Sequence, residues 1–465
     1  MIPQEETVKQ KEYIEKVSLL IETVFPASPK AFVHTYGCQG NVADSEKIKG
    51  MLVEMGYVLV DEVENSDLVI YNTCAIREHA EDRVFGNVGA LKNIKARNRQ
   101  MKIMLCGCMM QQKHIAEKIR KSYPFVDVVF GTHVLHRLPE FVYRSLANGE
   151  KFCEIPDGDG VIVENVPLHR DSDFKAWLPI MYGCNNFCSY CVVPYVRGRE
   201  RSRAPADVID EAKRLVKAGY KEITLLGQNV NSYGKNPDYG YDFARLLREI
   251  NDIEGDFIIR FMTSHPKDCT RELLDTIAGC NKVARHLHLP FQSGSNRVLK
   301  AMNRGYTVEQ YTELIDYAYK AIPDLSITAD VIVGFPGETY EDFCETVNLV
   351  KKAKFTSMFT FIFSAREGTK AAQMDDPVSE EEKSRWFREL LSVQESVAAE
   401  RTAESVGKTY RVLCESVSKT GLIQGRTGGN VIIEFPAPES VIGNFKNVTV
   451  TESLTWILRG RLLNE

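Results

Sequence analysis

The first third of the chain alternates short apolar runs with longer stretches of helical spacing. The apolar runs AFVHT, DLVIY, KIMLC and VDVVF predict strands at 31–35, 67–71, 102–106 and 126–130. Helical spacing follows them at about 45–56, 77–99, 109–122 and 135–147. Strands that alternate with helices favour a parallel sheet covered on both faces. We therefore expect a doubly wound α/β domain over 31–147, preceded by a polar, helix-prone lead-in over 1–30.

A second series of apolar runs begins after a polar, Gly/Asp-rich stretch at 148–169, which we interpret as a linker. Six runs predict strands: AWLPIM, EITLLG, DFIIRF, ARHLHLP, SITADVIVGF and FTSMFTFIF. Helical runs such as 206–220, 243–255 and 340–354 separate them. Six repeats fall short of the eight that close a (β/α)8 barrel. The pattern over 170–402 therefore predicts a partial (β/α)6 barrel, with its site at the carboxyl ends of the strands.

The pattern changes again in the last part of the chain, over 403–465. A charged helical stretch ends near Ser405, and short alternating strands with Gly turns follow. Period-2 alternation over such a length predicts a small β-barrel. Small barrels of this kind often bind RNA on one face, and Lys408, Arg411 and Arg426 are candidates for phosphate contacts. The alternative is that these are ordinary solvated charges, because acidic residues are almost as frequent here.

Composition narrows the classes of protein to consider. The chain has 465 residues, of which 44% are hydrophobic and 26% are charged. No apolar run reaches the roughly 18 residues of a membrane span, and the N-terminus is polar, so we expect a cytoplasmic protein without membrane contact. The net charge of −5 gives no general basic footprint, so nucleic acid must be bound by local patches. Because disulfides are rare in the cytoplasm, we interpret the 12 cysteines as thiolate ligands or buried thiols.

Three cysteines lie together in MYGCNNFCSYC, with the spacing C-x3-C-x2-C at Cys184, Cys188 and Cys191. Structural zinc requires a fourth ligand, which this loop does not supply. Three thiolates suit a cubane iron–sulfur cluster that keeps one iron open. The amino and carboxylate groups of S-adenosylmethionine can chelate such an iron, and an electron from the cluster then generates a 5′-deoxyadenosyl radical. The alternative is three unrelated cysteines.

Three further cysteines each follow a predicted strand of the first domain. Cys38 follows AFVHT, Cys74 follows DLVIY and Cys108 follows KIMLC. Ligands of open α/β sheets gather at the carboxyl ends of the strands, so these thiolates can converge although they are distant in sequence. The pattern predicts a second cluster with one open iron; the alternative is three buried thiols. Cys106 lies inside its strand, and we interpret it as a packing thiol.

Polar and basic segments surround the predicted cluster loop. The rim of the partial barrel carries polar or Gly-rich loops, which suit hydrogen bonds to a cofactor; they lie at 227–234, 263–266, 292–295, 334–339 and 364–369. Directly after the cysteine loop, VRGRERSR places an arginine at every second position. In an extended segment alternate side chains share a face, so these arginines are predicted to bind phosphate or a base. A solvated charge run is the alternative.

Together these motifs resemble a known family. Residues 31–465 resemble the radical-SAM methylthiotransferases, which have an N-terminal cluster domain, a radical-SAM core and a C-terminal TRAM domain. The resemblance is carried by TYGCQGN, NTCAIRE, GCMMQ, GCNNFCSYCVVPYVRGRERSR, LLGQNVNSYG, SHP, HLPFQSGS, DVIVGFPGET and SAREGT. TYGCQGN departs from the commoner TYGCQMN at Gly40. The resemblance implies an auxiliary [4Fe-4S] cluster on Cys38, Cys74 and Cys108, and the radical-SAM [4Fe-4S] cluster on Cys184, Cys188 and Cys191.

The resemblance and the rim loops also give expected contacts. Those with S-adenosylmethionine are Tyr190, Gln228, Asn229, Ser264, His288, Gln292, Gly334, Pro336, Gly337 and Glu338. Those with RNA are Arg197, Arg199, Arg201, Arg203, Asn231, Lys408, Arg411 and Arg426.

The implied activity is methylthiolation of carbon 2 of isopentenyladenosine at position 37 of tRNA. CVVPY, LLGQNVNSYG and TSHP are most similar to that branch of the family. The family uses two S-adenosylmethionine molecules per turnover and a sulfur carried on the auxiliary cluster. An electron donor such as flavodoxin or ferredoxin is implied, and we expect a monomer. Two alternatives stay open: methylthiolation of an aspartate in a ribosomal protein, and a zinc-stabilised RNA-binding protein without catalysis.

Overall fold

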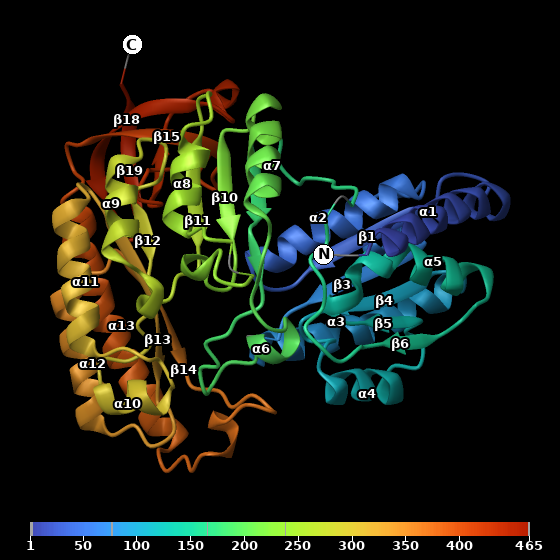
Figure 1. Cartoon of the computed structure of the whole chain (residues 1–465), viewed down its shortest axis with the longest axis horizontal. Coiled ribbons are helices and arrows are strands. Elements are labelled where there is room, and N and C mark those ends of the chain that lie inside the picture. The colour runs from blue at the N-terminus through green and yellow to red at the C-terminus, as the bar shows by residue number, and fades with distance from the viewer. Residues whose placement is uncertain (1–2, 76–77, 165, 238, 464–465) are drawn as a thin grey trace. The chain divides into compact units, whose positions relative to one another are not determined.

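The computed structural model describes residues 3–75, 78–164, 166–237 and 239–463 (Figure 1). The chain forms two compact units. Unit 1 comprises Met1–Asp171, Tyr182–Asn185 and Cys191–Arg201, and unit 2 comprises Ser172–Met181, Asn186–Tyr190 and Ser202–Glu465. Within the described ranges, none of the helices has both the length and the apolar surface needed to cross a membrane.

Unit 1 is built on a six-stranded parallel sheet with strand order β2-β1-β3-β4-β5-β6. Core residues of α1, α2 and α5 pack on one face, and those of α3 and α4 pack on the other. This confirms the predicted doubly wound domain. The strands are β1 (Lys30–Thr35), β2 (Val58–Leu59), β3 (Leu68–Thr73), β4 (Lys102–Gly107), β5 (Val128–Phe130) and β6 (Phe152–Glu154). The helices are α1 (Gln4–Val24), α2 (Gln39–Glu54), α3 (Glu78–Arg97), α4 (Lys113–Ser122), α5 (Leu138–Ala147) and α6 (Val193–Val196).

Two short strands of this sheet, β2 and β6, were not predicted from the sequence. β2 contributes two residues, and β6 contributes three residues that pair in parallel with β5. β6 lies inside the segment predicted to be a linker, so that prediction is wrong for Phe152–Glu154. The reason is physical: the strand is held by backbone hydrogen bonds and by the packing of Phe152 on the core, and three residues are too few to show a period of two.

The core of unit 2 is the predicted partial barrel of six strands. Two parallel three-stranded sheets, ordered β11-β10-β7 and β12-β13-β14, are joined by a parallel bridge between Ile259 and Val283. The strands are β7 (Lys175–Pro179), β10 (Glu222–Leu226), β11 (Ile258–Met262), β12 (His286–His288), β13 (Ser326–Val333) and β14 (Ser357–Ile362), and β8 (Met181–Tyr182) pairs with β9 (Arg201–Ser202).

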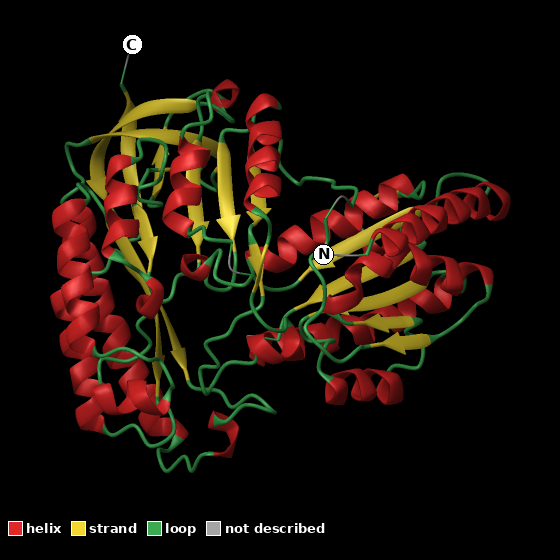
Figure 2. Ribbon diagram, in the orientation of Figure 1, coloured by secondary structure: helices red, strands yellow, loops and turns green. Residues whose placement is uncertain are grey.

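Helices cover the outside of this partial barrel, and its largest hydrophobic core lies between helices and strands (Figure 2). Asp242, Thr270, Thr307 and Thr339 cap α8, α9, α11 and α12 by accepting a backbone N–H, which fixes where each helix begins. The helices are α7 (Pro205–Lys217), α8 (Phe243–Asn251), α9 (Arg271–Gly279), α10 (Asn296–Ala301), α11 (Val308–Ala321), α12 (Tyr340–Ala353) and α13 (Glu380–Ala403).

The C-terminal part of unit 2 is a closed five-stranded barrel with order β15-β16-β17-β19-β18, as predicted. Its core consists of alternate inward residues such as Val412, Ile433 and Val448. The strands are β15 (Thr409–Val417), β16 (Ile423–Arg426), β17 (Ile432–Phe435), β18 (Phe445–Ser453) and β19 (Ile457–Leu462).

A buried ion pair fastens this small barrel to the amino ends of the core strands. Arg260 Nε lies 2.6 Å from Glu222 Oε2, and Arg260 Nη2 donates to the Thr427 carbonyl at 2.9 Å. Lys175 Nζ is 2.9 Å from Glu415 Oε1. Lys175 and Glu222 are the first residues of the parallel strands β7 and β10. The arrowhead of β10 points away from the small barrel (Figures 1 and 2). The barrel therefore sits at the end of the core opposite to the rim loops.

We expect Arg260→Met to destabilise unit 2 by about 3–5 kcal/mol, because it leaves the Glu222 carboxylate buried without its main counterion. The measurement is chemical unfolding of the full chain, followed by fluorescence. Arg245→Met is the matched control: its Nε lies 3.0 Å from Glu249 on the surface, where a pair contributes less than about 1 kcal/mol. Similar losses in both variants would contradict the role of Arg260.

Candidate metal centres and the polar rim

The three cysteines of unit 1 follow three neighbouring strands. Cys38 follows β1 and is the residue before α2, Cys74 follows β3, and Cys108 follows β4. β1, β3 and β4 are adjacent in the sheet. The turn before Cys38 requires glycine at Gly37, which has φ of +114° and whose added Cβ would lie 2.7 Å from Cys74 Sγ. The sheet therefore brings the Cys38 and Cys74 loops into contact, as the sequence predicts. Ile76 and Arg77 of the NTCAIRE motif lie outside the described residues.

The chemistry of Cys38, Cys74 and Cys108 suits a metal cluster that is bound by three thiolates. Cys74 and Cys108 are buried and Cys38 is half-buried. Burial raises the pKa of the Cys108 thiol to about 12, with Cys74 and Cys38 adding to the rise and Arg197 opposing it. Coordination to a metal deprotonates such thiols outright. Among the described residues no group of three or more His, Cys, Asp or Glu side chains is placed to hold a metal ion. The three thiolates of a cubane each bind a different iron, so they need not converge on one ion.

Asn41 ties the three cysteine loops together. Its Nδ2 donates to the Tyr36 carbonyl at 2.9 Å and to the Thr73 carbonyl at 3.0 Å, directly before the Cys38 and Cys74 turns. Its Oδ1 lies 3.6 Å from Cys108 Sγ. The side chain is fully buried. Asn41 lies in the TYGCQGN motif, which was the available signal for this residue, although the sequence did not show its role.

Arg197 belongs to the same cluster of side chains. Its Nε donates to Cys108 Sγ at 3.1 Å, and its Nη2 lies 2.6 Å from Asn41 Oδ1 and 2.8 Å from Asp44 Oδ2. The side chain is 8% exposed. Arg197 was predicted to contact RNA, but its guanidinium group is engaged at the Cys108 sulfur.

The prediction that four arginines of VRGRERSR share one face is wrong. Arg199 is exposed, whereas Arg203 is buried, donating to the Pro179 carbonyl and pairing with Glu211 at 2.8 Å. Arg201 is half-buried and donates to the carbonyls of Arg199 and Arg197. Only Arg201–Ser202 is extended, as β9, and Gly198 turns the chain before it with φ of +75°. RNA contact by Arg199 stays a prediction.

The Cys184–Cys191 loop contributes residues to both units, and each part has a backbone hydrogen bond within its own unit. In unit 1, Cys184 N–H donates to the Gly198 carbonyl at 3.2 Å. In unit 2, Ser189 N–H donates to the Met302 carbonyl at 3.0 Å, next to Cys188. Cys184 and Cys188 are buried and Cys191 is half-buried.

A buried arginine contacts the middle cysteine of this loop. Arg304 Nη1 lies 3.3 Å from Cys188 Sγ, and its Nη2 donates to the Pro290 carbonyl at 2.7 Å. Its Nε donates to the Tyr306 hydroxyl at 3.3 Å, and only 4% of the residue is exposed. Within the described part of the chain no carboxylate pairs with Arg304, so its charge faces the sulfur ligand. Sequence reasoning missed it because this contact is purely tertiary.

The loops after β10 and β11 carry buried polar atoms that lack a protein partner. They are Gln228 Oε1, Asn229 Oδ1, both amide atoms of Asn231, Ser264 Oγ and His265 Nε2. Buried polar groups are normally hydrogen-bonded, so this concentration suits a ligand with several donors and acceptors. Gln228, Asn229 and Ser264 were predicted for S-adenosylmethionine and Asn231 for the substrate, and the residues fit such a group.

His265 adds a donor that the sequence reasoning missed. Burial lowers the pKa of His265 to about 2, so the ring is neutral. Its Nδ1 accepts the Lys267 N–H at 3.2 Å, which places the proton on Nε2. The SHP motif was the only signal for this residue.

The remaining predicted contacts lie at the carboxyl half of the core strands. Glu338 Oε2 accepts the N–H groups of Gly334 at 2.6 Å and Phe335 at 3.2 Å, so it braces the loop that contains Pro336 and Gly337. Burial raises the pKa of the Glu338 carboxyl to about 7. Three further predicted residues are placed as follows: His288 Nδ1 is 2.9 Å from Thr328 Oγ1, Gln292 N–H donates to the Asp330 carbonyl at 3.0 Å, and Tyr190 OH is 3.4 Å from Arg304 Nη1.

The basic residues predicted to bind phosphate in the small barrel have protein partners. Lys408 Nζ is 2.7 Å from Asp324, Arg411 pairs with Asp256, and Arg426 Nε is 3.5 Å from Glu415. The first two pairs join the small barrel to the core, so their first role is structural. RNA contact by these three residues stays a prediction.

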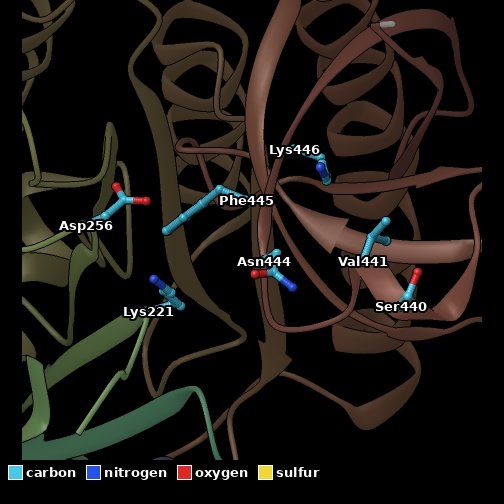
Figure 3. Close-up of a pocket in the computed structure, with 7 residues that line it drawn as sticks. All are labelled: Lys221, Asp256, Ser440, Val441, Asn444, Phe445 and Lys446. Carbon is cyan, nitrogen blue, oxygen red and sulfur yellow. The ribbon is translucent and has the colours of Figure 1, made fainter. Parts of the chain in front are cut away.

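A cavity of about 330 Å³ lies at the same junction (Figure 3). Figure 3 shows Phe445 and Asn444 between the two lysines, and the lining residues are Lys221, Asp256, Ser440, Val441, Asn444, Phe445 and Lys446. Lys221 and Asp256 precede β10 and β11, so the cavity is at the amino end of the core and not at the rim loops.

Comparison with known proteins covers nearly the whole chain. The Radical SAM superfamily matches residues 178–350, the uncharacterized protein family UPF0004 matches 30–131, and the TRAM domain matches 403–463. The tRNA-2-methylthio-N(6)-dimethylallyladenosine synthase of Thermoanaerobacter pseudethanolicus is 49% identical over 93% of this chain and 92% of that protein. The protein of the same name from Acetivibrio thermocellus is 48% identical over 99% and 97%.

Solved structures support the fold. The radical S-adenosylmethionine methyltransferase TsrM from Kitasatospora setae, with cobalamin and a [4Fe-4S] cluster bound, superposes with a TM-score of 0.53 at 15% identity. The match covers 74% of this chain and 77% of that chain. At this identity the likeness concerns the fold alone.

Proposed function

Because this chain belongs to the radical-SAM methylthiotransferases with UPF0004 and TRAM domains, and within them to the tRNA-2-methylthio-N(6)-dimethylallyladenosine synthases, we propose that it methylthiolates carbon 2 of isopentenyladenosine at position 37 of tRNA. The observation that carries the proposal is 48% identity along 99% of the chain to a synthase of that name. The product is 2-methylthio-N(6)-dimethylallyladenosine.

The cofactors are two [4Fe-4S] clusters and S-adenosylmethionine. Cys38, Cys74 and Cys108 would hold the auxiliary cluster, and the C-x3-C-x2-C loop would hold the other. When bound, these groups supply an adenosyl radical and a transferable sulfur, which carbon 2 of adenine requires because it is neither acidic nor electrophilic enough for polar chemistry.

The protein's own side chains would bind the cofactors and position the loops that hold them. Asn41 and Arg197 fix the loops and one sulfur of the auxiliary trio. Arg304 fixes the Cys188 sulfur and compensates negative charge beside it. The unpaired atoms of Gln228, Asn229 and Ser264 are available to hydrogen-bond the cofactor. Glu338 braces its loop by accepting hydrogen bonds from two backbone N–H groups.

The substrate is a folded RNA, so the target nucleotide must be splayed out of the anticodon loop, as is usual for enzymes that act on a base. A one-electron donor of the flavodoxin or ferredoxin class is required from outside the chain. We further propose that the protein works as a monomer in the cytoplasm, where its tRNA substrates are.

Deletion of the gene is expected to remove the methylthio group from isopentenyladenosine in tRNA, and the reconstituted enzyme is expected to restore it in vitro. Mass spectrometry of tRNA nucleosides measures both. Unchanged tRNA, together with loss of a methylthio group from a ribosomal-protein aspartate, would overturn the proposal in favour of the ribosomal branch. One or two zinc ions and no sulfide in the anaerobically purified protein would favour a non-catalytic RNA-binding protein.

A further inference from the structure

Two phenylalanines on the edge strand of the partial barrel are exposed. β14 pairs with β13 alone among the described strands. Phe359 is 56% exposed and Phe361 is 37% exposed, although both lie inside this strand. Neighbouring exposed aromatic side chains are costly in water and commonly mark a binding surface.

The two rings lie on the face of the sheet that the helices do not cover. α13 packs on the other face, where Thr360 Oγ1 donates to Gln394 Oε1 at 2.9 Å and Met358 is buried. Side chains alternate between the two faces of a strand. Phe359 and Phe361 therefore point toward the inside of the partial barrel.

The strand register shows what lies beside them. Asp330 pairs with Phe359, and Ile332 pairs with Phe361. On the same face, His288 Nε2 lies 3.6 Å from Asp330 Oδ1. The inner face thus has a polar part, His288 and Asp330, next to one ring, and an apolar part, Ile332, next to the other.

This surface is continuous with the radical-SAM cysteine loop. Ile332 and Tyr190 pack against the same hydrophobic cluster. Tyr190 lies between Cys188 and Cys191 in the sequence. Phe335 and Phe363, which follow β13 and β14, belong to the same cluster. The exposed rings therefore lie on the same side of the core as the loop that would hold the open iron.

We propose that Phe359 and Phe361 form the platform that receives the target nucleoside: the adenine stacks on Phe359 beside His288 and Asp330, and the dimethylallyl group packs on Phe361 and Ile332. This inference rests on the proposed function and names the recognition surface for its substrate. Single-stranded bases stack on aromatic side chains in RNA-binding proteins. An apolar surface next to the platform distinguishes a prenylated adenosine from a plain one, because only the former has an apolar group to bury.

The test compares two synthetic anticodon stem-loops, one with N(6)-dimethylallyladenosine and one with adenosine at the target position. Binding to the cluster-reconstituted full chain is measured by fluorescence anisotropy. We expect wild type to prefer the prenylated RNA, Phe361→Ala to reduce that preference toward one, and Phe359→Leu to weaken binding of both RNAs by about tenfold. Phe359→Tyr keeps an aromatic ring and is expected to bind like wild type.

Leu391→Ala is the matched control, since Leu391 is 39% exposed on α13, one of the helices that cover the outside of the core. RNA binding, S-adenosylmethionine cleavage without RNA and the thermal midpoint should all be unchanged in this control. Retention of the full prenyl preference in a Phe359→Leu/Phe361→Ala double variant would overturn the inference, as would loss of S-adenosylmethionine binding with intact RNA binding. Failure of wild type to modify tRNA would instead refute the proposed function.

Discussion

Replacing Cys184, Cys188 and Cys191 together by Ala will abolish cleavage of S-adenosylmethionine and lower the iron content from about eight to about four atoms per chain. The expectation follows from the ligand count: three thiolates hold one cubane, and without them no open iron remains to chelate the cofactor. Iron and sulfide analysis of the anaerobically reconstituted protein, with chromatographic detection of 5′-deoxyadenosine, measures both effects.

Two matched variants make this result specific. Cys153→Ala removes an exposed thiol of β6 and should keep both the iron content and the cleavage. The Cys38/Cys74/Cys108→Ala variant should also fall to about four irons but still cleave S-adenosylmethionine, while losing methylthiolation of tRNA. Cleavage that survives without the C-x3-C-x2-C cysteines would refute the assignment of that loop.

Replacing Arg304 by Met will make the radical-SAM cluster harder to reduce. A cationic donor at a cluster sulfur stabilises the more negative, reduced state, and Arg304 is buried 3.3 Å from Cys188 Sγ. Loss of one charge-assisted hydrogen bond is expected to lower the ratio of reduced to oxidised cluster about tenfold at a fixed potential, or about 59 mV for a one-electron couple. A redox titration followed by electron paramagnetic resonance measures the shift, in the Cys38/Cys74/Cys108→Ala background.

Tyr306→Phe serves as the control for this experiment. It removes the hydroxyl that Arg304 Nε contacts and leaves the contact to sulfur in place. Its midpoint potential should match that of the parent protein, and Arg304→Lys, which keeps the charge without the forked geometry, should fall between the two. An unchanged potential in Arg304→Met with full iron content would show that Arg304 only supports the fold.

Much of the architecture was predictable because it depends on local patterns. The strands β1, β3 and β4 and five strands of the partial barrel have five to eight residues and alternate with helices. β5 and β12 have three residues each and were still predicted, because they lie inside the longer apolar runs VDVVF and ARHLHLP. The strands that precede Cys38, Cys74 and Cys108 are neighbours in the sheet, so the three cysteines lie at the same edge. β2 and β6 were missed because their two or three residues lie in no longer apolar run that would mark a strand.

The surroundings of the cysteines were less predictable, because they depend on contacts between distant segments. Arg197 and Arg203 belong to a charge run whose pattern predicts solvent exposure or RNA contact, yet both are buried, and the chain turns at Gly198 between them. Arg304 has no motif of its own; its function follows from its 3.3 Å approach to Cys188, which is 116 positions away. Sequence spacing predicts the cysteines, whereas the arginines that contact their sulfur atoms are brought there by the tertiary fold.

The attachment of the small barrel to the amino ends of the core strands sets a length scale for RNA. A strand of eight residues such as β13 spans about 26 Å. An RNA that contacted the small barrel and the rim loops at once would have to span about that distance. Its stem would contact the small barrel, and its splayed base would lie at the rim loops. The protein would then bind RNA according to the length of its stem. A shortened stem would lose its contact with the small barrel and bind more weakly, although every contact to the base would remain.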